Sequence, residues 1–426
     1  MIQHLATLLM LLMLGAPQSP AATPLLLTGA RVLDPAGRHL LENRSVLIAD
    51  GHIIAVIADG DLPLPQAENA KRLNLEGLVL LPGLMDLHSH LLLHPYDEAV
   101  WNDQVLRESL GLRTIRATVA AKATLAAGFT TLRDLGTEGA GYADVALRDA
   151  ITQGIIPGPR LVVVTRAIVA TGCYGPSGFD PRWTMPKGAQ VADGVAGVRR
   201  VVREQIAAGA DWIKVYADYR RKPGGPATPT FSQEELNALV QEARSAGLRV
   251  SAHATTNEAI RRAVRAGVST IEHGYGASAE VLALMKKHGV ALCPTLTAAE
   301  SMARYAGWRP GLVEPTGLRA AKAMFARALA SGVTIACGSD VGVFSHGQNA
   351  RELELMVACG MSPVQALRSA TLVAAEVLGR EDDLGRINKG YIADLVAVRD
   401  DPLEDITSIR KPAMVFKGGR VVLDKR

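Results

Sequence analysis

The sequence predicts an α/β protein in which a (β/α)8 TIM barrel is joined to a small β-sandwich domain built from both chain ends. Between residues 83 and 384, apolar strand-like runs alternate eight times with segments of helical period. Residues 23–82 and 385–426 instead hold short strands separated by turn signals. A chain of 426 residues is long enough to hold both domains.

Residues 1–22 have the pattern of a secretory signal peptide. An apolar run over residues 5–16 is followed by "PQSPAA", which offers small residues for cleavage near Ala22. The run is too short to span a bilayer. No Lys or Arg precedes it, so a buried first helix is the alternative. We expect an exported protein, periplasmic or secreted from a bacterium, without a membrane anchor after cleavage.

The predicted β-sandwich takes strands from both ends of the chain. The N-terminal part reads "LLLTGARVLDP", "SVLIADGHIIAVI" and "KRLNLEGLVLL", with "DG" turn signals. The C-terminal part returns to this style in "GYIADLVAVRDDP" and "PAMVFKGGRVVLD". Because two strand-rich ends flank a different middle, we expect them to form one small domain together.

The barrel strands are expected at eight apolar runs, which are residues 83–90, 129–136, 160–168, 211–217, 248–254, 269–274, 290–296 and 333–340. Glycine ends a helix at little cost in the left-handed conformation. Six intervening helices stop at such a residue directly before the next strand: Gly128, Gly209, Gly247, Gly267, Gly289 and Gly332. A doubly wound open sheet is the competing topology, but no GxGxxG phosphate loop follows any strand.

Charge and cysteine usage exclude several classes of partner and site. The formal net charge is +4, and the basic doublets at 199–200 and 286–287 lie in helix-like stretches, so no nucleic-acid-binding stripe is predicted. Of the four cysteines, Cys293 and Cys337 lie in apolar runs and are expected to be buried free thiols. No CxxC pair is present, which argues against a structural zinc knuckle.

The predicted strands carry an unusual set of polar side chains. In "GLMDLHSH", the alternation of side chains along a strand directs His88 and His90 to the same face. Later strands add Lys214, His253, His273 and Asp340. Taken singly, a histidine at a strand end is more often a hydrogen-bonded core residue, the lysine could pair with a carboxylate, and the aspartate could cap a helix. Function in such barrels lies at the carboxyl ends of the strands, so the joint pattern predicts one site.

The residue types in this set suit a metal centre. Histidine and carboxylate are common ligands of Zn²⁺, and a catalytic site keeps an open position for water. A protonated lysine has three donors and no acceptor, so it cannot be a ligand. Burial lowers the pKa of a lysine, and the neutral amine can react with CO₂ to give a carbamate that bridges two metal ions. A carboxylated Lys214 would explain a lysine among these ligands.

With "LPGLMDLHSH" and the split β domain, this set resembles the amidohydrolase superfamily over nearly the whole mature chain. "IKVYA", "TIEHG" and "SHGQNARELELMVACGMSPVQALRSAT" are similar to its prolidase-like, zinc-dependent carboxypeptidase branch, which includes enzymes that hydrolyse the amide of ochratoxin A. The branch often has "GGHG" after the third strand, where this chain reads "TGCYG" with Cys173 and Tyr174. The role of that histidine is therefore open in this chain.

The resemblance implies a binuclear hydrolase that cleaves the amide bond next to a C-terminal amino acid. Asp340 would act as general base and then as general acid. A small amide or dipeptide is the expected partner, two divalent ions with zinc as the expected metal are the cofactors, and a homo-oligomer is implied by the resemblance alone. The implied ligands are His88, His90 and Asp340 for one ion, His253 and His273 for the other, and carboxylated Lys214 between them.

The stretch "YADYRRK" after the fourth strand offers candidates for holding a substrate carboxylate: Tyr216, Tyr219, Arg220 and Arg221. An arginine can grip a carboxylate through two parallel hydrogen bonds. An ordinary solvated loop is the alternative. His346, in "FSHGQN" after the eighth strand, either contacts substrate or orders its loop, and His94 is expected to be a loop residue.

Rival functions stay open at this point. The same ligands could serve a cyclic-amide hydrolase, a lactonase or a phosphotriesterase, because loops choose the substrate and the metal ligands do not. A mononuclear deaminase has no use for Lys214. A non-catalytic metal-binding protein is disfavoured, since all six ligand positions are filled.

Overall fold

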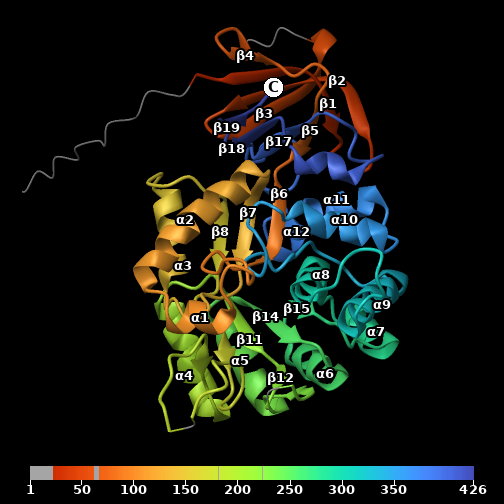
Figure 1. The fold of residues 1–426 in the computed structure, drawn as a ribbon. Coiled ribbons are helices and arrows are strands. Elements are labelled where there is room, and N and C mark those ends of the chain that lie inside the picture. Colours follow the sequence, from red (N-terminus) through yellow and green to blue (C-terminus); the bar gives the residue numbers. More distant parts are fainter. Residues whose placement is uncertain (1–22, 62–66, 181, 223) are drawn as a thin grey trace, which may run out of the picture.

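The computed structural model describes residues 23–61, 67–180, 182–222 and 224–426. It shows a mixed α/β protein, with a β-sheet at one end of the molecule and alternating strands and helices in the remainder (Figure 1). The predicted signal peptide, residues 1–22, lies outside the described residues. Within the described ranges, no helix is long and apolar enough to cross a membrane.

Both chain ends contribute to one eight-stranded sheet, at the top of Figure 1. Its order is β19 (Arg420–Asp424), β18 (Met414–Lys417), β17 (Leu395–Val398), β5 (Val79–Pro82), β1 (Leu25–Leu33), β2 (Leu40–Ala49) and β3 (His52–Ala58), with β4 (Lys71–Asn74) paired to β1. β5 joins the two chain ends, because it pairs with β1 on one side and with β17 on the other. Leu80, Leu395 and Phe416 are buried in the core of this sheet. Its division from the rest as a separate sandwich domain stays a prediction.

The middle of the chain supplies two parallel sheets. One contains β6 (Leu84–Ser89), β7 (Phe129–Asp134) and β8 (Arg160–Val163). The other runs in the order β10 (Gln190–Val191), β9 (Ile168–Val169), β11 (Trp212–Tyr216), β14 (Arg249–Ala254), β15 (Thr270–His273) and β16 (Ala291–Cys293). The backbone N–H of Asp211 donates to the carbonyl of Val163 at 2.8 Å, which links the start of β11 to the end of β8. The short hairpin of β12 (Asp218–Arg220) and β13 (Ala227–Pro229) follows β11.

The eighth predicted strand is wrong as a regular strand. Residues 333–340 make only an isolated bridge between Leu292 and Ile335, and Val341 just beyond makes another with Ser89. The backbone is irregular here: Asp340 has φ 63°, and Gly338 leaves no room for a side chain, because an added Cβ would lie 2.9 Å from the Cβ of Cys293. The segment still lies between β16 and β6, since both bridges connect it to those strands.

Helices cover the outside of these parallel strands (Figure 1). They are α1 (Trp101–Leu106), α2 (Leu110–Ala126), α3 (Ala143–Thr152), α4 (Gly194–Ala207), α5 (Gln233–Ser245), α6 (Asn257–Ala266), α7 (Ala279–Lys287), α8 (Leu296–Tyr305), α9 (Thr316–Ser331), α10 (Ala350–Ala358), α11 (Pro363–Ser369) and α12 (Leu372–Leu378), with 3-10 turns at Asp59–Asp61 and Ile406–Arg410. All six glycines predicted to end helices have positive φ, for example 94° at Gly267 and 69° at Gly332. A capping box at Ser232 starts α5.

The cysteines are all free, and Cys293 and Cys337 are buried, as predicted. Cys293 packs with Met85, Leu87 and Trp212 under the parallel strands. Burial raises the pKa of both thiols well above its ordinary value. These two cysteines therefore behave as core residues.

Candidate metal centre

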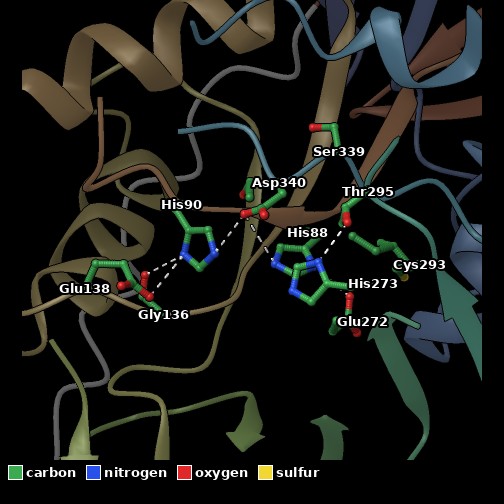
Figure 2. A network of polar contacts seen from close by, with 12 residues as sticks. His88, His90, Gly136, Glu138, Glu272, His273, Cys293, Thr295, Ser339 and Asp340 are labelled. Atoms are coloured by element: carbon green, nitrogen blue, oxygen red, sulfur yellow. Dashed lines mark hydrogen bonds and ion pairs between the residues drawn. The ribbon is translucent and has the colours of Figure 1, made fainter. Parts of the chain in front are cut away.

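His88, His90 and Asp340 lie together at the carboxyl end of β6 (Figure 2). Their ligand atoms all lie within 4.8 Å of one another. The Oδ1 atom of Asp340 is 3.5 Å from Nε2 of His88 and 3.3 Å from Nε2 of His90. The backbone N–H of Asp340 donates to the carbonyl of His88 at 2.7 Å, which ties the two segments together. Two imidazole nitrogens and one carboxylate thus converge, and His88 and His90 share a face, as the alternation of side chains predicted.

The Nδ1 atoms of three site histidines already have partners, which orients their Nε2 atoms toward the centre. His88 Nδ1 donates to Oε2 of Glu272 at 2.8 Å, and His90 Nδ1 donates to the carbonyl of Gly136 at 3.0 Å. His273 Nδ1 lies 2.8 Å from the hydroxyl of Thr295 (Figure 2). Metal-binding histidines commonly use such a partner on the second nitrogen to set the tautomer and the ring orientation.

Sequence reasoning missed Glu272 and Arg133, which form a buried ion pair behind His88. Arg133 donates to Oε1 of Glu272 at 2.9 Å, and neither side chain has any solvent exposure. The other Glu272 oxygen receives the His88 proton, so the arginine holds the carboxylate that holds the imidazole. Burial opposes the charge on Glu272, but Arg133 and His88 outweigh it and hold the pKa of that carboxyl well below its usual range. A charged residue inside an apolar strand run was the signal available in the sequence.

Lys214 lies in the middle of β11 and is 1% exposed. Its Nζ has no hydrogen-bond partner among the described residues, and it lies 5.6 Å from the ring centroid of Tyr216. Burial lowers the pKa of Lys214 to about 8. An unpartnered buried amine is costly, so this position calls for a ligand or a modification that satisfies it.

His253 and His273 follow on β14 and β15, with ring centroids 4.5 Å apart. The ring of His273 is also 5.0 Å from that of His88, so both imidazoles adjoin the first group. Tyr216 stacks on His253, with ring centroids 4.6 Å apart. Nε2 of His253 lies 3.6 Å from Oδ1 of the buried Asp218. The four histidines therefore form one continuous cluster across neighbouring strands.

The electrostatics keep most of these imidazoles neutral, which is the form that binds metal. Burial lowers the pKa of His88 to about 4, that of His253 to about 3, and that of His273 well below its usual value. His90 differs: burial lowers its pKa, but the carboxylates of Asp340 and Glu138 outweigh burial and raise it to about 9. A divalent cation beside Asp340 would replace that proton.

Backbone strain is concentrated at the same place. Four non-glycine residues of the site have left-handed backbone angles, with φ of 68° at His273, 63° at Asp340, 52° at Thr295 and 51° at Glu138. Each such conformation costs on the order of 1 kcal/mol and persists where the surroundings enforce it. The strain indicates that the surrounding structure holds these four residues in fixed positions.

Tyr174 lies with Cys173 in the stretch "TGCYG", which corresponds to the "GGHG" of the resembling branch. Its hydroxyl donates to Oε2 of Glu138, which also accepts from Nε1 of Trp101 at 2.8 Å. Oε1 of Glu138 is 3.8 Å from Nδ1 of His90, and the Tyr174 ring stacks on Tyr216 at 4.4 Å. Tyr174 therefore contacts both histidine groups indirectly: through Glu138 to His90, and through Tyr216 to the ring of His253.

A cavity of about 750 Å³ opens above this centre. Tyr216, Tyr219 and Arg220, three of the residues predicted to contact substrate, line it; their role in binding stays a prediction. Arg221 does not line the cavity: it is exposed and donates to the carbonyl of Pro229 at 3.1 Å, because the β12–β13 hairpin turns it outward.

His346 and His94 are also outside the lining of the cavity. Nε2 of His346 lies 3.0 Å from the carbonyl of Leu93, so this histidine orders its loop. His94 pairs with Glu108 at 2.8 Å and Glu98 at 3.1 Å, away from the cluster, as expected of a loop residue.

The residues present fit a metal centre. Four imidazoles and one carboxylate supply nitrogen and oxygen ligands of the kind that zinc prefers. The orphaned Nζ of Lys214 is accounted for if the amine is carboxylated, because its two new oxygens would then be ligands.

Comparison with known proteins identifies the family of this chain. The profile of the amidohydrolase family matches residues 79–422. The chain belongs to the amidohydrolase family. This amidohydrolase is 32% identical over 429 residues to the ochratoxinase of Aspergillus niger, with 92% of this chain and 85% of the relative covered.

Solved structures show the same similarity. The crystal structure of the A. niger ochratoxinase superposes with a TM-score of 0.81 at 29% identity, covering 95% of this chain and 97% of that chain. A prolidase complexed with N-methylphosphonate-L-proline superposes with a TM-score of 0.83 at 33% identity, covering 94% and 100%. A Xaa-Pro dipeptidase with methionine bound in its active site has a TM-score of 0.83 at 30% identity, covering 94% and 99%.

Proposed function

We propose that this amidohydrolase uses two divalent metal ions to cleave the amide bond next to a C-terminal amino acid, as a carboxypeptidase or dipeptidase does. One observation carries the proposal: the rings of His88, His90, His253 and His273 form one cluster with Asp340 in the lining of a cavity that Arg220 also lines. The buried amine of Lys214, on the strand next to that of His253, has no partner among the described residues. We assign His88, His90 and Asp340 to one ion, His253 and His273 to the other, and a carboxylated Lys214 to the bridge.

The chain's own residues would divide the chemistry as follows. Two bound divalent ions would supply an activated water and a polarised scissile carbonyl. Asp340 faces both imidazole Nε2 atoms, so its carboxylate is placed to take the proton of that water and pass it to the leaving nitrogen. Glu272, Gly136 and Thr295 hold the ligand rings during these steps.

Arg220, at the rim of the cavity, is assigned to the substrate carboxylate, with Tyr219 beside it. The relatives support a substrate of this kind, since they include prolidases and an ochratoxinase. Ochratoxin A, cleaved to ochratoxin alpha and phenylalanine, is therefore a candidate substrate. A cyclic amide, a lactone or a phosphotriester on the same centre would appear as turnover in a parallel assay panel.

Several further expectations belong to the same proposal. Zinc as the bound metal, closure of the parallel strands into an eight-stranded barrel, a homo-oligomer and export of the mature chain stay predictions. Metal analysis of the purified protein would test directly whether zinc is the bound metal.

The deciding experiment targets Lys214, because only the bridging role requires a carboxylate at that atom. Lys214→Ala should lose amidase activity on N-acyl amino acids and lose bound metal, and added acetate or propionate should restore part of both. Lys214→Met is the matched control: its longer side chain fills the space, so a small carboxylate should not restore it. Full activity in Lys214→Ala without added carboxylate would refute the bridging role.

A further inference from the structure

Two structurally different walls face each other across the cavity. One is the β12–β13 hairpin after β11, with Arg220, Gly225 and Pro226 in the lining. The other is α8, which follows β16. In the sheet order, β14 and β15 lie between β11 and β16, and these two strands carry His253 and His273. A substrate that reaches from the hairpin to α8 must therefore pass over the metal centre.

The α8 wall is apolar, and most of its side chains are alanines. Its lining residues are Ala298, Ala299, Met302, Ala303 and, directly after the helix, Ala306, with Leu318 of α9 beside them. The charged residues of α8 lie elsewhere: Glu300 binds both Arg304 and Arg351, each at 2.9 Å. The wall thus offers no partner for a carboxylate, whereas the hairpin offers an arginine.

Packing alone does not account for this wall. Ala298 and Ala303 are 5% and 7% exposed, but Met302, one turn along the same face, is 50% exposed at the cavity. A large apolar side chain left half uncovered beside small ones leaves apolar surface available to a ligand. The space that larger residues would have filled is part of the cavity of about 750 Å³, which is in the range of small-molecule sites.

We propose that the α8 wall binds the acyl group of the substrate, while the β12–β13 hairpin with Arg220 binds the amino-acid carboxylate. This inference rests on the proposed function and narrows it to N-acyl amino acids with an extended apolar acyl chain. The scissile amide then lies between the two walls, over His253 and His273. Each acyl methylene that α8 removes from water should raise kcat/KM by about fourfold.

The test compares N-acetyl-, N-butyryl- and N-octanoyl-phenylalanine as substrates of the zinc-loaded enzyme. For the wild type, kcat/KM should rise by more than tenfold from acetyl to octanoyl. Ala303→Leu places extra atoms in the wall, so it should remove most of that rise, measured as the ratio of kcat/KM on the octanoyl substrate to kcat/KM on the acetyl substrate in the same variant. Ser301→Leu is the matched control, because Ser301 is on α8 but does not line the cavity.

A binding measurement separates the wall from the chemistry. Octanamide, a neutral probe without a carboxylate, should bind the metal-free wild type and the Ser301→Leu variant more tightly than it binds Ala303→Leu, as followed by ligand-observed NMR. Thermal unfolding of each variant shows whether it is folded, and Ala303→Ser provides a smaller change if the leucine variant is not.

The outcomes distinguish the two levels of the proposal. No hydrolysis of any acyl-phenylalanine would overturn the proposed function itself. Hydrolysis of all three at equal kcat/KM would overturn only the acyl wall. A change in preference for the amino-acid side chain in Ala303→Leu, with the acyl dependence unchanged, would reverse the assignment of the two walls and also overturn the inference.

Discussion

The buried ion pair behind His88 gives the sharpest prediction about stability. Replacing Arg133 with methionine leaves Glu272 uncompensated in a place where neither residue is exposed. Breaking such a buried pair on one side costs about 3–5 kcal/mol. Arg133 also donates to the carbonyl of Leu87 at 2.7 Å and to the hydroxyl of Thr270 at 3.1 Å, so these acceptors lose a donor as well.

The magnitude can be expressed as a melting temperature. Unfolding entropy near 60 °C is about 2.1 cal/mol/K per residue, or roughly 0.8 kcal/mol/K for about 400 residues, so a loss of 3–5 kcal/mol lowers the midpoint by about 4–6 °C. The assay is calorimetry of the metal-free protein at neutral pH. Metal affinity should fall about 10- to 100-fold as well, because Glu272 orients His88 through Nδ1.

A second variant makes the reasoning refutable. Arg133→Met combined with Glu272→Gln removes both charges, and the glutamine can still accept the His88 proton. This double variant should recover at least half of the lost stability. If Arg133→Met lies within about 1 kcal/mol of the wild type, or if the two changes are additive, the carboxylate is not held by the arginine in the way the geometry indicates.

Three further predictions follow from other parts of the structure. Arg220→Met should raise KM for N-acyl amino acids by tenfold or more, with little change in kcat. Arg221 lies outside the cavity, so Arg221→Met should leave both constants unchanged. Equal effects of the two substitutions in steady-state assays would contradict the assignment of Arg220 to the substrate carboxylate. Tyr174→Phe removes one of two donors to the buried Glu138 and should cost about 1–3 kcal/mol in urea unfolding, and no measurable loss would argue against that contact. Burial raises the pKa of Glu352 from 4.5 to about 8, so the folded state holds one more proton than the unfolded state between these pH values. The free energy of unfolding should therefore fall as pH rises across this window, by roughly 5 kcal/mol in total. The Glu352→Gln variant should show a flatter dependence of stability on pH, and an equally steep one would exclude this carboxyl as the cause.

The sequence by itself determined the features that depend on local periodicity. Alternation along one strand was enough to place His88 and His90 on the same face, and the glycines with positive φ mark the predicted helix ends. The apolar runs around Lys214 predicted its burial in a strand. These predictions succeeded because neighbouring residues along the chain decide strand pleat, helix termination and local hydrophobicity.

Only the tertiary structure decided which distant side chains meet. His88 and Glu272 are 184 residues apart in sequence, and no local pattern encodes their contact. The same holds for Tyr174, whose hydroxyl meets Glu138, and for the hairpin that directs Arg220 into the cavity and Arg221 out of it. The irregular eighth strand, with Asp340 in a left-handed conformation, also depends on packing against β16 and β6. The physical reason is that these features arise from long-range burial and pairing, which exist only after the strands have assembled.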